Sequence, residues 1–274
     1  MLVPEQDRRY IFVTPYYKET RACLERCIAS VKRQPMGADH ILVADGFPQD
    51  WLDQAGVRHL RLDRAHGDYG NTPRGVGSLM AVAEGYEGIG LLDADCWLEP
   101  DHLEHCLAQA GEVGFEKCGF VVTSRTLRRP DESIIDVDDE LPAVHVDTNC
   151  FFFLPPSFNA LSVWMLIPRE VSSICDRVFF HALRARNFVS AVSVKKTVNY
   201  TYTYASVYRQ LGEVPPTFAK ENPDYRAMAT WINTLHQGRL QLINQRLGAD
   251  LRLVYPLHWL VSVRPGTKRV GRVG

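Results

Sequence analysis

An acidic pair follows a short apolar run near the middle of the chain. The run Gly88–Leu92 carries no charge, and Asp93 and Asp95 come directly after it. Such a run is typical of a strand buried on both faces of a sheet, and side chains two apart on a strand point to the same side. At the carboxyl end of a strand, the two carboxylates could hold a hard divalent cation together with water and phosphate oxygens. A solvated turn, or a cap for the helix that begins near Pro100, is the plainer interpretation.

Apolar runs and helical repeats alternate through the first half of the chain. The pattern predicts strands over residues 10–17, 40–48 and 57–62, and helices over residues 19–34, 78–86 and 101–110. Strands that alternate with helices are typical of a parallel sheet with right-handed crossovers. Thr14, Pro15 and Tyr16 end the first strand and Asp45 follows the second, so we expect them at the same sheet edge as the acidic pair.

A glycine-rich segment over residues 65–77 precedes the helix expected from Ser78. At a helix N-terminus, its backbone N–H groups could contact a phosphate, with Arg74 as a bidentate donor. Alternatively, the glycines only serve the turns of a surface loop. The pair Gly75 and Gly77 is a weak signal by itself, and the Walker lysine of phosphate-binding loops is missing.

The second half of the sequence is less regular. Strands are expected over residues 118–124, 147–154, 164–168 and 192–204, and helical segments over residues 168–187 and 223–248. The acidic residues between positions 131 and 140 are expected to form an exposed connection. The apolar segment 255–263 is expected to pack on the core, and a dimer contact or a membrane surface is the alternative for it.

Composition and charge narrow the class of protein. With 274 residues, of which 46% are hydrophobic and 23% charged, the chain is long enough for one large α/β domain with an extension. A net charge of -1 argues against a dedicated nucleic-acid-binding protein, although four basic residues and no acid stand at the end of the chain: Arg264, Lys268, Arg269 and Arg272. Seven cysteines without a C-x-x-C pair, a polar N-terminus and no long apolar window predict a cytoplasmic protein, or one peripheral to the inner face of the membrane.

Five motifs occur in the order found in a known enzyme family. They are the strand ending in Thr14-Pro15-Tyr16, the S-V-x-x-Q of residues 30–34, the strand and Asp-Gly turn of residues 41–46, the stretch from residue 74 to Asp95, and residues 97–104. Over residues 10–110 the sequence therefore resembles the GT-A glycosyltransferases, most closely the inverting family 2 type.

This resemblance implies a fold and a division of the chain. The fold would be α/β of the GT-A, Rossmann-like type: a mostly parallel sheet flanked by helices, with a mixed C-terminal part and a helical C-terminal extension. Residues 1–110 would form the nucleotide-sugar-binding half of a single domain. Residues 111–215 would form its acceptor-binding half, and residues 216–274 the helical extension.

The resemblance also implies roles for individual residues. Asp45 would contact the base or ribose of a UDP or GDP sugar, and Asp93 the donor sugar or ribose. Asp95, with Asp93, would hold Mn or Mg against the diphosphate, while Arg74 helps to offset the charge of the leaving group. The Thr14-Pro15-Tyr16 turn would line the same donor site.

An inverting transferase also needs a carboxylate that takes the proton of the acceptor hydroxyl. The resemblance places this base at a helix start well after the acidic pair, where Asp176 is the best-placed candidate and Asp147 the rival. Asn149 could hydrogen-bond a sugar, and Asp176 could instead form only an ion pair with Arg177. The acceptor would be a saccharide or another hydroxyl compound. Because the Q-x-x-R-W motif of processive synthases is missing, we expect transfer of a single sugar.

Other classes of protein fit the same motifs less well. A haloacid-dehalogenase-like phosphatase also has D-x-D after an apolar strand, but on its first strand rather than on the fourth. A dinucleotide-binding oxidoreductase needs G-x-G-x-x-G after the first strand, where Thr14-Pro15-Tyr16 stands. A nucleotidyltransferase typically opens with a glycine- and arginine-rich loop, which is missing here. A non-catalytic GT-A domain that binds nucleotide sugars is the further alternative.

Overall fold

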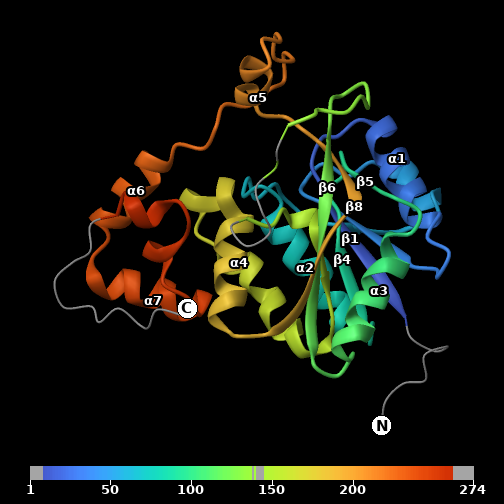
Figure 1. Cartoon of the computed structure of the whole chain (residues 1–274), viewed down its shortest axis with the longest axis horizontal. Coiled ribbons are helices and arrows are strands. Elements are labelled where there is room, and N and C mark those ends of the chain that lie inside the picture. The colour runs from blue at the N-terminus through green and yellow to red at the C-terminus, as the bar shows by residue number, and fades with distance from the viewer. Residues whose placement is uncertain (1–8, 138, 140–144, 262–274) are drawn as a thin grey trace.

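The computed structural model describes residues 9–137, 139 and 145–261 of the chain (Figure 1). Within these residues, eight strands form one sheet in the order β3-β2-β1-β4-β7-β6-β8-β5. The strands are β1 (Tyr10–Tyr16), β2 (Asp39–Ala44), β3 (Arg58–Arg61), β4 (Gly88–Leu91), β5 (Trp97–Leu98), β6 (Cys118–Arg128), β7 (Phe151–Phe153) and β8 (Val189–Thr201).

The first half of the chain forms the parallel part of the sheet. β1 runs parallel to both β2 and β4, and β2 runs parallel to β3. Every residue of β1 is buried, as expected for an uncharged strand with neighbours on both sides and helices on both faces. The strands predicted in this half, including the run before the acidic pair, are confirmed.

β7 reverses the direction of the sheet. It pairs antiparallel with β4 on one side and with β6 on the other, while β8 runs parallel to β6. The amino end of β7 therefore lies at the same edge as the carboxyl ends of β1, β4, β6 and β8. The short 3₁₀ turn η3 (Thr148–Cys150), directly before β7, is thereby placed next to the residues that follow β4.

Helices cover both faces of this mixed sheet. In Figure 1, α1 and α3 lie on one side of the sheet and α2 and α4 on the other, while α6 and α7 lie beyond α4. The helical segments predicted over residues 168–187 and 223–248 are confirmed, the first as the 3₁₀ turn η5 (Arg169–Ile174) followed by α4. The helices are α1 (Arg21–Lys32), α2 (Asn71–Ala83), α3 (His102–Val113), α4 (Cys175–Ala185), α5 (Ala205–Gln210), α6 (Tyr225–Thr234) and α7 (Gln237–Leu247).

The strand predicted over residues 164–168 is wrong. Residues up to Leu166 belong to the 3₁₀ segment η4 (Pro155–Leu166), which begins with two prolines that lack the N–H group of a strand ladder. Trp164 is fully buried and stacks on Phe179 of α4, with 3.9 Å between ring centroids. The apolar residues around Trp164 in the sequence are therefore explained by packing between helical segments and not by a strand of the sheet.

The start of α2 also differs from the prediction. Asp68 accepts hydrogen bonds from the backbone N–H (3.0 Å) and hydroxyl (2.6 Å) of Thr72, so the helix begins seven residues before the expected Ser78. Gly75 and Gly77 consequently lie inside the helix. A Cβ atom on Gly77 would lie 2.6 Å from a methyl group of β1. Gly77 allows the helix to approach the sheet closely, and Gly75 allows it to approach Met165 of η4, so the two glycines do not form a phosphate loop.

The C-terminal segment packs partly on the core. Leu257, in the 3₁₀ turn η7 (Leu257–Trp259), and Val261 are buried, whereas Trp259 is 72% exposed. The expected core packing is confirmed for Leu257 and Val261 but not for Trp259 and Leu260, which are exposed. Residues 262 and 263 and the terminal basic residues lie outside the described part. A membrane or dimer contact through this segment stays a prediction. In the described residues, no helix is both long and apolar enough to cross a bilayer.

Candidate active site

The acidic pair lies in a turn after β4 rather than on the strand itself. The turn is closed by a hydrogen bond from the Cys96 N–H to the Asp93 carbonyl (3.0 Å). The Asp95 carbonyl accepts hydrogen bonds from the Arg26 guanidinium (2.8 Å) and the Thr201 hydroxyl (2.5 Å). The two carboxylates are therefore positioned by this turn and by its anchors on α1 and β8, and not by strand alternation as predicted.

Asp93 is fixed by two side chains from distant parts of the sequence. Arg74 Nη2 donates to Asp93 Oδ1 (2.8 Å), and Asn149 Nδ2 donates to Asp93 Oδ2 (3.2 Å). The side-chain Oδ1 of Asn149 also accepts from the Asp93 backbone N–H (2.5 Å). Burial of Arg74 opposes its charge, but Asp93 outweighs this effect and raises the pKa of the guanidinium. The structure thus brings together three residues that the sequence proposed separately.

Asp95 is held in a different environment from Asp93. Its carboxylate is half-buried and accepts a weak hydrogen bond from the Cys96 thiol (3.3 Å). Burial and the neighbouring Asp93 carboxylate raise the pKa of Asp95 to about 7, against the opposing effects of Cys96 and Lys220. Asp95 is therefore a carboxylate that would gain from a nearby positive charge.

This arrangement fits a divalent cation bound mainly through Asp95. The described residues contain no cluster of three or more His, Cys, Asp or Glu side chains that could enclose a metal ion. A cation with one or two protein carboxylates and otherwise water and phosphate ligands is the usual arrangement for Mg²⁺. The raised pKa of Asp95 indicates the excess negative charge that such an ion would neutralise.

Asp45 lies at the carboxyl end of β2, where the sequence placed it. Only 4% of its surface is exposed, and its Oδ1 accepts from both the backbone N–H (2.9 Å) and the ring Nδ1 (2.7 Å) of His66. Gly46 has a left-handed φ of 80°, and a Cβ atom there would lie 2.3 Å from the Ala65 nitrogen. The Asp45-Gly46 turn therefore holds the loop that precedes α2.

The turn after β1 is more buried than its predicted role suggests. The Thr14 hydroxyl is hydrogen-bonded to His40 (2.7 Å) inside the sheet, and burial lowers the pKa of His40 to about 3, so that this imidazole is neutral. The Tyr16 hydroxyl is hydrogen-bonded to His59 (2.7 Å). Pro15 is buried as well. The side chains of these residues form the frame of the site, and their contact with a donor stays a prediction.

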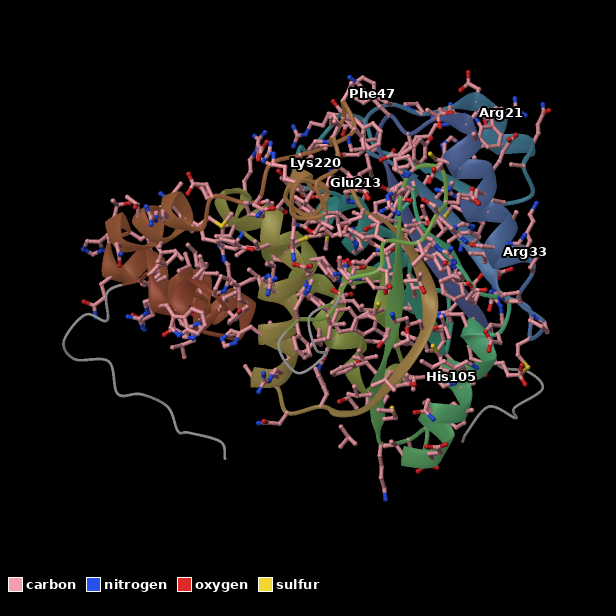
Figure 2. The ribbon with its side chains drawn as sticks, turned by 45° about the horizontal axis from the view of Figure 1, so that its top comes forward. Arg21, Arg33, Phe47, His105, Glu213 and Lys220 are labelled. Carbon is pink, nitrogen blue, oxygen red and sulfur yellow. The ribbon has the colours of Figure 1, made fainter. Side chains whose placement is uncertain are left out.

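Two lysines stand at this end of the molecule. Lys18 Nζ lies 4.2 Å from the ring centroid of Phe47, and Lys220 Nζ lies 5.9 Å from that of Tyr69. Figure 2, which turns the upper end of Figure 1 forward, shows Phe47 and Lys220 at that end. Lys220 is close enough to Asp95 to lower the pKa of its carboxyl group. The positive charge of Lys220 therefore favours the ionised form of Asp95 in the acidic turn.

A cavity of about 310 Å³ is lined in part by residues of β6 and β8. Asp147 and Asp176, the two candidate bases, both line it. Asp147 Oδ1 accepts from Asn149 Nδ2 (2.7 Å), and Asn149 in turn contacts Asp93. The side chain of Asn149 therefore links Asp147, which lines the cavity, to Asp93 in the acidic turn.

Asp147 is almost completely engaged inside the protein. Its Oδ2 is paired with the Arg125 guanidinium, and its Oδ1 accepts from Asn149. Arg125 also donates two hydrogen bonds to Asp139, at 2.7 and 3.0 Å. Burial raises the pKa of Asp147, although Arg125 acts in the opposite direction. Its position is that of a structural carboxylate.

Asp176 stands in the first turn of α4 and faces the cavity. Its Oδ2 is hydrogen-bonded to His145 Nε2 (2.6 Å), and its Oδ1 accepts from the Arg177 backbone N–H (2.7 Å). Burial opposes its ionisation, but His145 and then Arg177 outweigh burial and lower the pKa of Asp176. This carboxylate is therefore ionised near neutral pH.

Sequence reasoning missed several residues that shape the site. His66, Arg125 and His145 each bind one of the key carboxylates, and Lys220 acts on Asp95. A single histidine or arginine carries no spacing signal, because its partner is far away in the sequence.

Comparison with known proteins identifies the fold. The chain is similar to S. aureus TarS 1-349 in complex with UDP, with a TM-score of 0.53 and 13% identity, over 87% of this chain and 69% of that one. It is equally similar to the complex of TarS 1-349 with UDP-GlcNAc, with a TM-score of 0.52 and 14% identity, over 87% and 70%. The protein is thus an α/β protein with a GT-A type fold.

Comparison at the level of sequence shows similarity to one family over part of the chain. Residues 11–134 match glycosyl transferase family 2. The putative glycosyltransferase EpsH of Bacillus subtilis (strain 168) is 23% identical over 212 residues, which are 70% of this chain and 59% of EpsH, so less than two thirds of that relative is covered. Over part of its length, including residues 11–134, the chain is therefore similar to glycosyltransferases of family 2.

Proposed function

We propose that this protein transfers a single sugar from a nucleotide-diphosphate sugar to the hydroxyl group of an acceptor, with a divalent cation and with inversion at the anomeric carbon. The observation that carries the proposal is the acidic turn. Arg74 and Asn149 fix Asp93 there, while Asp95 keeps a carboxylate whose pKa is raised to about 7. The match to glycosyl transferase family 2 supports the same conclusion.

The donor is proposed to lie across the carboxyl edge of β1, β2 and β4. Asp45 would contact the base or ribose, Asp93 the ribose or donor sugar, and Asp95 would hold Mn or Mg beside the diphosphate. The bound ion would neutralise charge that builds up on the leaving nucleoside diphosphate. UDP and UDP-GlcNAc, the ligands of the similar TarS structures, favour a UDP sugar over a GDP sugar.

Asp176 is proposed as the base. The acceptor oxygen would attack the anomeric carbon while the bond from that carbon to the diphosphate oxygen breaks, and the hydroxyl proton would move to the Asp176 carboxylate. A single displacement of this kind inverts the configuration. Asp176 suits the role better than Asp147, because the Asp147 side chain is only 8% exposed and forms a buried ion pair with Arg125, whereas the Asp176 side chain is 21% exposed.

Calorimetric titration of UDP and GDP, with and without Mn²⁺, tests the donor site. We expect UDP binding that requires Mn²⁺ and is lost in Asp95→Ala. The matched control is Asp101→Ala, which removes a carboxylate paired with Lys195 outside the site. UDP binding that needs neither Mn²⁺ nor Asp95 would contradict the proposal, and phosphate release from small phosphomonoesters would indicate the phosphatase alternative.

A panel of nucleotide sugars separates an enzyme from a non-catalytic binding domain. An enzyme should release the nucleoside diphosphate from at least one donor in the presence of Mn²⁺, and Asp176→Asn should slow this release while leaving UDP affinity unchanged. Binding of UDP without turnover of any donor would favour the non-catalytic alternative. The anomeric configuration of the product, measured by NMR, decides between inversion and retention.

A further inference from the structure

A row of tyrosines lines the cavity beside the proposed base. The sequence Tyr200-Thr201-Tyr202-Thr203-Tyr204 continues β8 in extended form past the sheet edge, so every second residue points to the same side. The ring centroids of Tyr200 and Tyr202 are 6.0 Å apart, and so are those of Tyr202 and Tyr204. All three half-buried rings line the cavity, and we call them the tyrosine ladder.

The tyrosine ladder connects the two ends of the cavity. At one end, the Arg125 guanidinium lies 4.5 Å from the ring centroid of Tyr200. At the other end, burial and then the Asp176 carboxylate raise the pKa of the Tyr204 phenol. Tyr204 is therefore the ring of the ladder that lies near the proposed base.

The described residues that line the cavity offer an acceptor no net positive charge. Its charged lining consists of three carboxylates and two guanidinium groups, together with His145: Arg125, Asp139, Asp147, Asp176 and Arg177. Arg125 is already bound to Asp139 and Asp147, and the Arg177 guanidinium lies 5.3 Å from the ring centroid of Tyr255. A phosphate or carboxylate on the acceptor would therefore gain no net attraction from these groups.

From this combination we infer that the tyrosine ladder is the acceptor subsite, and that it binds a neutral saccharide whose terminal ring lies against Tyr204 with a hydroxyl near Asp176. The inference rests on the proposed function and specifies its acceptor. The faces of a pyranose present C–H groups that pack on the negative face of an aromatic ring, while tyrosine hydroxyls can bond sugar hydroxyls. A volume of about 310 Å³ suits a short saccharide.

The test measures binding of the full chain, with UDP and Mn²⁺ present, to an array of neutral oligosaccharides and their phosphorylated and carboxylated counterparts. The best neutral ligand is then titrated against variants. Tyr204→Leu removes the aromatic face but keeps apolar bulk, and Tyr204→Phe keeps the ring. Trp259→Ala is the control, since it removes an aromatic ring that is 72% exposed and does not line the cavity.

We expect the wild type to bind at least one neutral saccharide, and its anionic counterparts about tenfold more weakly. Tyr204→Leu should weaken the neutral ligand about tenfold, whereas Tyr204→Phe should stay within about threefold. Trp259→Ala should have no effect, and UDP affinity should be equal in all variants. Thermal melting of each variant shows that it is folded.

Three results would overturn the inference. These are a preference for phosphorylated or carboxylated ligands, the absence of binding to any neutral saccharide, and equal affinity of Tyr204→Leu and the wild type. Failure of the proposed function gives a different result. In that case UDP does not bind to the wild type with Mn²⁺, while the array without nucleotide still reports whether Tyr204 binds a saccharide.

Discussion

Replacing Asp95 with asparagine should stabilise this protein while removing the metal-dependent nucleotide binding that we propose for it. The folded protein holds the Asp95 carboxylate next to Asp93 and partly out of water, which raises the pKa of Asp95 from 3.8 to about 7. Ionising Asp95 at higher pH therefore costs free energy in the folded state that the unfolded chain does not incur. An asparagine of nearly the same shape carries no charge and avoids this cost.

The magnitude follows from the two pKa values. A rise from 3.8 to about 7 corresponds to ~4 kcal/mol of unfolding free energy once both states are ionised. Because the side chain keeps some contact with water, we expect Asp95→Asn to gain about 1–3 kcal/mol at about pH 8. Between pH 4 and pH 7 the folded state binds more protons than the unfolded state, so the wild type loses stability relative to the variant as pH rises. Below both pKa values the difference should vanish.

Urea denaturation in EDTA, at about pH 4.5 and about pH 8, measures this difference. Adding Mn²⁺ should then stabilise the wild type, by about 2.7 kcal/mol at a hundred times the dissociation constant, but not Asp95→Asn. Asp101→Asn is the control, and it should lower the stability at about pH 8 rather than raise it. The reason is that the hydrogen bond from Lys195 lowers the pKa of Asp101. If Asp95→Asn were less stable than the wild type at about pH 8, or if the gap did not change with pH, the account of the acidic turn would be refuted.

Further predictions address the proposed base Asp176, the hydrogen bonds from Asn149 to Asp93, the close contacts of Gly77 and the pH dependence of UDP binding. Asp176→Asn should lower kcat by about 10²–10⁴ without changing UDP affinity, as measured by steady-state kinetics and calorimetry. Asn149→Ala removes the partner of the Asp93 N–H and of Asp93 Oδ2. It should therefore destabilise the protein by about 1–3 kcal/mol in urea denaturation and weaken Mn²⁺-dependent UDP binding. Gly77→Ala should cost about 1–3 kcal/mol of stability, because the new Cβ atom would meet valine methyl groups of β1 and β2 at 2.6 and 2.9 Å, while nucleotide affinity of the folded protein is unchanged. Mn²⁺-dependent UDP affinity should fall about tenfold per pH unit well below pH 7, because Asp95 takes up a proton. If calorimetry gave the same UDP affinity at every pH from 8 to 5, this assignment would be wrong.

Most of the features that could be predicted from the sequence depend on residues that are close together along the chain. The strand before Asp93 and the helices of the first half follow from the spacing of apolar residues, which records burial along one element. The order of the motifs from Thr14 to Asp95 indicated the glycosyltransferase family. The acidic pair itself was visible because both carboxylates belong to one short turn.

The tertiary structure decided which distant residues meet. The reversed strand β7 brings Asn149 to Asp93, and no periodic pattern records strand order or register. The same edge joins Asp176 to His145 and buries Asp147 against Arg125, which separates two carboxylates that looked equivalent in the sequence. The sequence by itself therefore determined the elements and the acidic turn. Only the folded chain assigned an environment to each carboxylate, because pKa and hydrogen bonding depend on neighbours that are far apart along the chain.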